Sequence, residues 1–145
     1  MNNIGLKKLR LQLNRNENNL IKASLPYLKS FINEMNGFYP FAMIMDNNKK
    51  IRSISPDVEF EDEYPNSQYL IELYEKGIEN EFKKLDSEYD IAILCIDTFL
   101  NEKIDNVELK KNAIELRLIT SSNRKSIKLI YSIINNEVIF MDWIF

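Results

Sequence analysis

Apolar residues in the first third of the chain recur with the spacing of a helix. They lie three or four positions apart and form one stripe: Ile21, Leu25, Leu28, Ile32 and Met35. Pro26 interrupts the stripe, so either Ser24 caps a helix with Pro26 in its first turn, or a longer helix is kinked at Pro26. Residues 14–19 are polar and predict a loop, while the leucines before them fit a strand or a helix equally well, so residues 1–19 are an N-terminal segment of uncertain structure.

The middle of the chain predicts a hairpin and a second helix. Apolar residues follow one another in the strand predicted over 38–46, and Asn47-Asn48 can supply a tight turn into a return strand over 50–55. Residues 57–65 predict an acidic loop, after which Asn66 or Ser67 caps a helix over 68–85. The apolar stripe of this helix consists of Ile71, Tyr74, Ile78, Phe82 and Leu85.

From residue 91 onward the pattern is that of a sheet. Residues 91–100 are apolar on both faces, which predicts a central strand covered on both sides. Three further strands follow as a meander, with a tight turn at Asn135-Asn136. We therefore expect one α+β domain over residues 1–145, with an antiparallel sheet of five to six strands and two main helices. The expected order is α-β-β-α-β-β-β, with or without one further strand.

The last strand, 138–145, is apolar on both of its faces. An open edge this hydrophobic would invite aggregation. We expect that it is either an inner strand of the sheet or a strand covered by a partner. In the second case a homodimer would place Trp143 near the centre of its interface, because aromatic residues dominate such contacts.

Composition excludes several classes of active site. The chain has no histidine, which removes Ser-His and Cys-His nucleophiles and most transition-metal sites, and we expect no cofactor. The single cysteine, Cys95, fits a reducing compartment, and residues 1–20 lack the apolar run of a secretory signal, so we predict a cytoplasmic protein. No apolar run approaches the roughly 20 residues that span a bilayer, and we expect no membrane partner.

Charge is distributed unevenly along the chain. The formal net charge of −3 combines +4 over residues 1–35 with −9 over residues 57–90. A general nucleic-acid binder would need a larger excess of positive charge, so we expect no nucleic-acid partner. The acidic segment 57–63 lacks the glycine of a calcium loop and is a candidate for binding a basic protein. Its candidate contact residues are Glu59, Glu61, Asp62 and Glu63.

Two aspartates at the ends of apolar strands are the candidates for chemistry. Asp46 ends the strand over 38–46, and Asp97 shares a face with Ile93 and Cys95, which predicts partial burial. Paired carboxylates can do acid–base work if their environments separate their pKa values. The alternative is that each aspartate is a hydrogen-bonded structural residue, and Cys95, at a strand centre, is expected to be inert.

Short motifs resemble those of a widespread bacterial family of small proteins that has no established activity. They are Phe38-Tyr39-Pro40-Phe41-Ala42, Tyr64-Pro65-Asn66-Ser67, Leu94-Cys95-Ile96-Asp97 and Lys111-Asn112-Ala113-Ile114. The resemblance covers residues 25–145 and assigns no catalytic residue. At the level of class, the chain is also similar to small acidic immunity proteins that neutralise bacterial toxins.

Three hypotheses of function remain open. The first is a non-enzymatic protein-binding protein of the immunity type, which binds a basic toxin through the acidic segment 57–63. The second is a small ligand-binding domain or enzyme that uses Asp46 and Asp97. The third is a homodimeric scaffold assembled through the last strand.

Overall fold

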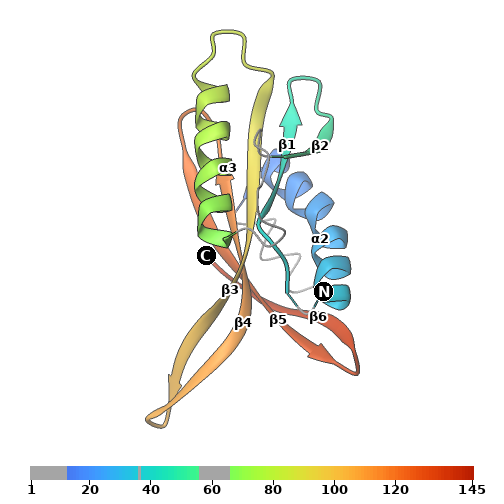
Figure 1. Cartoon of the computed structure of the whole chain (residues 1–145), viewed down its shortest axis with the longest axis vertical. Coiled ribbons are helices and arrows are strands. Elements are labelled where there is room, and N and C mark those ends of the chain that lie inside the picture. Colours follow the sequence, from blue (N-terminus) through green and yellow to red (C-terminus); the bar gives the residue numbers. More distant parts are fainter. Residues whose placement is uncertain (1–12, 36, 56–65) are drawn as a thin grey trace.

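The computed structural model describes residues 13–35, 37–55 and 66–145. They form two helices and six strands, and the strands make one antiparallel sheet of order β2-β1-β3-β4-β5-β6. The predicted α+β class, element order and strand number are confirmed (Figure 1). The elements are α2 (Arg15–Met35), β1 (Phe41–Asp46), β2 (Ile51–Ile54), α3 (Ser67–Phe82), β3 (Tyr89–Ile104), β4 (Val107–Ile119), β5 (Arg124–Ile134) and β6 (Glu137–Ile144).

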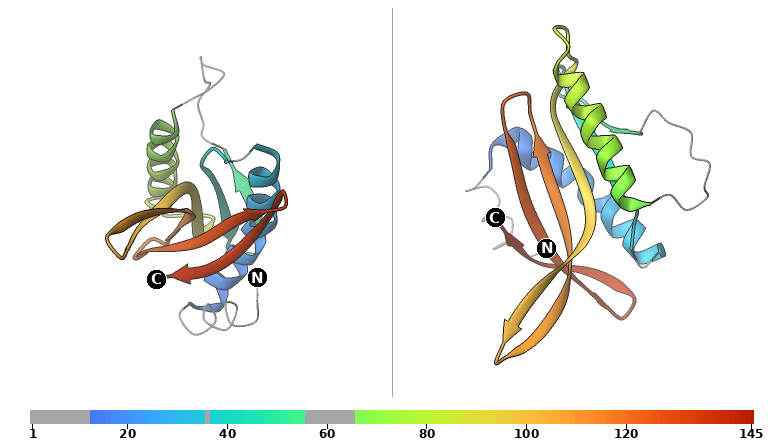
Figure 2. Two further views of the ribbon diagram at one scale, coloured as in Figure 1. Left: turned by 90° about the horizontal axis from the view of Figure 1, so that it is seen from below. Right: turned by 60° about the vertical axis from the view of Figure 1, so that its left-hand side comes forward.

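The two helices cover opposite faces of the sheet (Figures 1 and 2). Leu28 and Ile32 of α2 pack with one set of alternating sheet residues, which includes Ile93, and Trp143 joins the same cluster. Ile78 of α3 packs with the intervening residues of β1 and β3 on the other face. The two periodicities of the sequence, 3.6 for the helices and 2 for the strands, therefore meet in two separate core layers.

Helix α2 begins earlier than the sequence analysis predicted. The loop predicted over 14–19 is wrong, because Asn14 and Glu17 form a reciprocal capping pair. The Asn14 side chain accepts from the backbone N–H of Glu17 at 2.8 Å, and the Glu17 carboxylate accepts from the N–H of Asn14 at 2.9 Å. Glu17 is also paired with Lys125 of β5 at 3.0 Å, which ties the start of the helix to the sheet.

Of the two alternatives predicted for the first helix, the structure shows the longer helix that includes Pro26. Pro26 lies inside α2, and Ser24 is a buried residue whose hydroxyl donates to the Ile21 carbonyl at 2.7 Å, so it is not a cap. Helix α3 is capped as predicted by Asn66, whose side chain accepts from the N–H groups of Gln68 and Tyr69. It ends at Phe82, short of the predicted residue 85.

In the hairpin of β1 and β2, the positive φ angle falls on a different residue from the expected one. Asn47-Asn48 was predicted to supply positive φ angles, but Lys49 is the residue with a positive φ, of 65°. The carboxylate of Asp46 stabilises this turn, because it accepts from the N–H groups of Asn48 and Lys50 at 2.8 and 3.0 Å. The turn therefore follows the hydrogen bonds of Asp46 and not the preference of asparagine alone.

The central strand β3 is longer than predicted. Residues 91–96 are buried on both faces, which confirms the expected double covering of this part. The strand then continues to Ile104 and returns as β4 through a tight turn at Asp105-Asn106, both of which have positive φ. The second predicted turn, Asn135-Asn136, is confirmed, with φ of 53° and 62°.

Strand β6 lies at the edge of the sheet, so its predicted inner position is wrong. No described strand pairs with its outer side. Val138 and Trp143 are buried on the α2 side, whereas Ile139 and Ile144 on the opposite side are more than a third exposed. Both faces of this strand carry apolar residues, but only the face toward α2 is covered by the residues that the structure describes.

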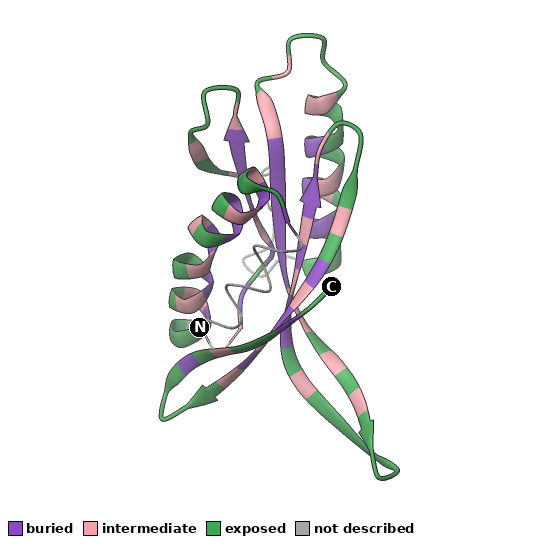
Figure 3. Ribbon diagram, turned by 180° about the vertical axis from the view of Figure 1, so that it is seen from behind, coloured by how far each residue is buried: buried purple, intermediate pink, exposed green. Residues whose placement is uncertain are grey.

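The lower half of the sheet divides into two hairpins. Pairing between β4 and β5 ends at Ala113 and Ile130, and beyond this point the two hairpins diverge (Figure 1). We call residues 98–113 the β3–β4 arm, residues 131–140 the β5–β6 arm, and the space between them the fork. Figure 3 shows that burial is concentrated above the fork and that the two arms are largely exposed.

Candidate functional site

Asp97 is a half-buried carboxylate held in place by its own surroundings. One carboxylate oxygen accepts from the Tyr131 hydroxyl at 3.2 Å. Gly37 packs so closely against the other oxygen that a Cβ at position 37 would lie 3.1 Å from it, and the φ of Gly37, +149°, favours glycine as well. Burial raises the pKa of the Asp97 carboxyl, and hydrogen bonds from Tyr131 and from the backbone of Phe38 and Thr98 oppose that shift.

The structure does not bring the two candidate aspartates together. Asp46 pairs with Tyr89, and Asp97 lies eight residues farther along β3. At about 3.3 Å per residue the two carboxylates are roughly 26 Å apart. Asp46 binds the backbone of its own turn, as described above, so each carboxylate has a local structural partner.

Cys95 is fully buried at the centre of the sheet. Burial raises the pKa of its thiol far above the usual range, and a hydrogen bond with Ser24 opposes that shift. A thiol with so little thiolate character is a poor nucleophile. The expectation that Cys95 is inert stays a prediction.

The candidate partner-binding residues fall into two groups. Glu59, Glu61, Asp62 and Glu63 lie outside the residues that the structure describes. Trp143 is fully buried in the core of its own chain, where it lies opposite Leu129. Its indole ring is therefore covered by its own fold and is not at the surface where a dimer contact would need it.

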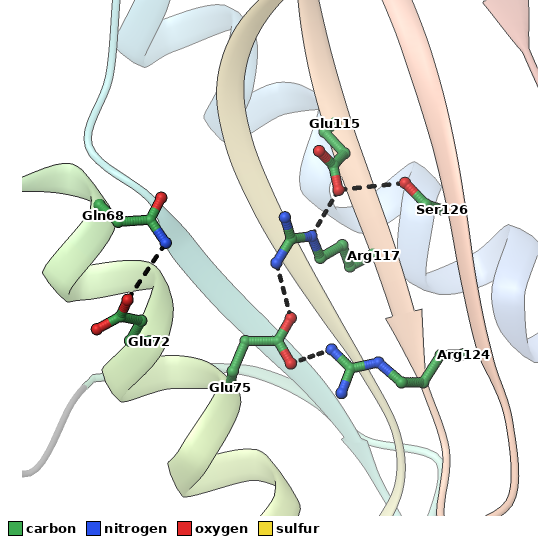
Figure 4. Close-up of polar contacts among 7 residues, drawn as sticks. All are labelled: Gln68, Glu72, Glu75, Glu115, Arg117, Arg124 and Ser126. Atoms are coloured by element: carbon green, nitrogen blue, oxygen red, sulfur yellow. Dashed lines mark hydrogen bonds and ion pairs between the residues drawn. The ribbon is translucent and has the colours of Figure 1, made fainter.

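A network of charged side chains joins α3 to strands β4 and β5 (Figure 4). Glu75 binds Arg117 of β4 at 2.9 Å and also pairs with Arg124 of β5. Arg117 in turn binds Glu115, which accepts from Ser126 at 3.2 Å. Every charge in the network has an opposite partner within it, so the network holds the helix against the sheet and presents no unbalanced charge to a ligand.

The arms carry an unusual number of exposed apolar side chains. On the β3–β4 arm Phe99, Ile104, Val107 and Leu109 are 42–57% exposed. On or beside the β5–β6 arm the exposed apolar residues are Ile133, Ile134, Ile139, Met141 and Ile144. Full burial of one such side chain contributes about 1.5–3 kcal/mol, and these residues leave 38–57% of their surface in water. A surface of this kind marks an interaction site.

The fork is hollowed at its base. A hollow of about 610 Å³ is lined by apolar residues, which include Leu100, Ile130 and Ile133, and by charged residues, which include Glu102 and Lys111. A second hollow of about 400 Å³, on the side of Asp97, is lined by Phe99, Lys110, Asn112 and Tyr131 among others. Sequence reasoning missed this region. The sequence feature that points to it is the set of apolar residues at 99, 104, 107 and 109. The alternation of apolar and polar residues does not show whether these four lie in the core or at the surface.

Comparisons with known proteins identify no relative for this chain. No family model, curated protein or solved structure matches it. Within the part of the chain that the structure describes, no helix is long and apolar enough to cross a membrane. The same residues include no group of three or more Cys, Asp or Glu side chains placed to hold a metal ion.

Proposed function

We propose that this chain is a non-enzymatic protein-binding protein and that the fork is its binding surface. The observation that carries the proposal is the set of exposed apolar side chains on both arms. Exposed apolar side chains beside charged ones are the usual composition of a protein–protein interface. The candidate catalytic groups, in contrast, are engaged in structural hydrogen bonds or buried. A cytoplasmic location is part of this proposal.

The test uses a photo-crosslinking amino acid placed at Ile133, inside the fork. The matched control carries it at Lys50, an exposed residue in the turn between β1 and β2, which lies beside the Tyr89 end of β3 and away from the arms. We expect Ile133 to give a defined protein adduct in the native host and Lys50 to give none. The adducted protein, made separately, should then bind Ile133→Asp at least tenfold more weakly than the wild type, and Lys50→Glu unchanged. Equal adducts at both positions, or equal affinities, would contradict the proposal.

The finer proposal is an immunity-type protein that neutralises a basic toxin. It is supported by the charge of residues 57–90 and by the exposed Glu72 and Glu79 of α3, which continue the acidic segment 57–63 into the described structure. Charges at the rim of an interface act mainly on the association rate. Replacing Glu59, Glu61, Asp62 and Glu63 with Gln or Asn should slow association with the partner and flatten its salt dependence. Unchanged kinetics at low salt would remove the segment from the interface.

A second candidate function is small-ligand binding at Asp97. It is favoured by one observation, that this half-buried carboxylate lines the hollow of about 400 Å³ together with Lys110 and Asn112. A ligand there would compete with the Tyr131 hydroxyl for Asp97. In a thermal-shift screen of small amines, a compound that raises the Tm of the wild type and not of Asp97→Asn would support this function. A screen without such a compound would count against it.

A further inference from the structure

The inner edge of β4 is an open strand edge at the fork. Residues 107–112 pair with β3 on one side, whereas β4–β5 pairing has already ended at Ala113. Within the described residues no strand occupies the other side. Unpaired backbone N–H and C=O groups in an extended strand form a template for another strand.

The charges along this edge are arranged so that the strand complements itself. Glu108 and Lys110 are two residues apart and share one face of the arm, while Leu109 between them faces the other side. The three side chains are exposed. An antiparallel pair of identical strands reverses the order of these charges, which places the acid of one strand near the base of the other.

Symmetry restricts the register of such a pair. In a two-fold dimer the axis is perpendicular to the plane of the paired strands, so each face of one strand continues the same face of its copy. Residues that lie opposite each other point to the same face, and the residue nearest the axis therefore pairs with its own copy. With Leu109 on the axis, Glu108 of each copy lies opposite Lys110 of the other. With Glu108 or Lys110 on the axis, two like charges would face each other, which is destabilising.

We infer that a second copy of this chain binds in the fork through antiparallel pairing of the two β4 edges, with Leu109 on the two-fold axis. This inference rests on the proposed function, since it names one protein that the fork binds. Val107, which is 57% exposed in the single chain, lies two residues from Leu109 on the same face of β4 and would lose exposed area on association.

Among the strands that the structure describes, no other open edge carries this arrangement. Strands β2 and β6, at the two borders of the sheet, contain no acid and base two residues apart, and neither does the inner edge of β5 over residues 131–134. The outer edge of β3 over residues 98–104 also lacks it. The edge of β4 is therefore the one among these that selects its own copy by charge.

Disulfide trapping tests both the contact and its register. In the paired strands the two Cα atoms at position 109 would be about 4.5–5.5 Å apart, within the range of a disulfide. The two copies of position 107 would be offset by four residues, or about 13 Å, which is too far. We expect Leu109→Cys to form a covalent dimer under mild oxidation and Val107→Cys, the matched control, to remain monomeric. Cys95 is buried and does not compete.

Charge reversal provides a second, independent measurement. Glu108→Lys and Lys110→Glu should each raise the Kd for self-association at least tenfold in sedimentation experiments. An equimolar mixture of the two variants should associate again, because every facing pair then carries opposite charges. Since Lys103 lies opposite Glu108 within the arm, recovery in the mixture also shows that the variant arms remain folded.

The inference is overturned if Leu109→Cys crosslinks no more than Val107→Cys, or if the wild type sediments as a monomer at about 100 μM. A foreign protein captured at Ile133 by a chain that fails both of these tests would leave the proposed function standing and remove only self-association. Failure at Ile133 together with trapping at position 109 would leave the second copy as the partner.

Discussion

Strand β3 passes through two environments that differ although its sequence is apolar in both. Residues 91–96 are buried on both faces between α2 and α3. Residues 98–104 belong to the β3–β4 arm, where Phe99 and Ile104 are both 46% exposed. The difference is not in the strand but in what covers it, because the β3–β4 arm extends beyond both helices (Figures 1 and 2).

This comparison separates the part of the chain that provides stability from the part that is available for binding. In the upper half, side chains on both faces of the sheet are removed from water and contribute to the free energy of unfolding. In the arms, comparable side chains keep much of their area in water and can contribute when a partner covers them. A substitution in one half should therefore change a different measurement from a substitution in the other.

The largest effect is expected from deletion of residues 141–145. The deletion removes Trp143, which is fully buried among the residues that pack under α2, and loss of a buried Trp alone costs about 3–5 kcal/mol. It also removes the pairing of the end of β6 with β5. We expect insoluble or unfolded protein, as judged by circular dichroism and light scattering. A truncated chain as stable as the full one would show that the edge strand is dispensable.

A smaller effect is expected from Ile93→Ala, and its matched control is Ile104→Ala. Both residues lie on β3, but Ile93 is fully buried and Ile104 is 46% exposed. We expect Ile93→Ala to lower the free energy of unfolding by about 2–5 kcal/mol. Ile104→Ala should change it by less than about 0.5 kcal/mol. Urea denaturation of the two variants measures both values, and similar losses would break the division of β3 into two halves.

Asp97, at the boundary of the two halves, should show an intermediate effect. Asp97→Ala leaves the Tyr131 hydroxyl without its acceptor and should cost about 1–3 kcal/mol, measured by urea denaturation. A specific activity lost in a well-folded Asp97→Ala protein would instead show that the carboxylate is functional.

The pH dependence of stability sharpens this prediction. Burial raises the pKa of Asp97 in the folded protein, so the folded state favours the protonated form. The corresponding stabilisation is complete at a pH below the ordinary aspartate range and is lost as the pH rises through the raised pKa. The stability of the wild type relative to Asp97→Asn should therefore fall between acidic and neutral pH. A constant difference would contradict the assignment.

The sequence predicted the layered fold because its two periodicities are strong. It failed at local signals that compete with periodicity. Asn14 and Glu17 have the spacing of a capping pair, yet the polar residues around them looked like a loop. Asp105-Asn106 is a tight-turn dipeptide of the same kind as Asn135-Asn136, and it was overlooked because the apolar run of β3 ends well before it.

The candidate site could not be predicted in the same way. Apolar residues alternate along a strand in the same way whether a helix covers them or they face water. The exposure of Leu109 therefore depends on where α2 and α3 end over the sheet. The edge position of β6 is equally a property of the whole sheet. Partial burial of Asp97 was predictable, in contrast, because it follows from alternation with Ile93 and Cys95 in one strand.

The position of Trp143 gives the molecule a built-in optical reporter. It is the single tryptophan of the chain, it is completely shielded from water, and it belongs to the outermost strand of the sheet. Its emission should be blue-shifted in the native protein and should move to the red when β6 leaves the sheet. Events confined to the tip of the β3–β4 arm should leave that spectrum unchanged. One fluorescence trace can therefore distinguish peeling of the C-terminal edge from docking at the fork.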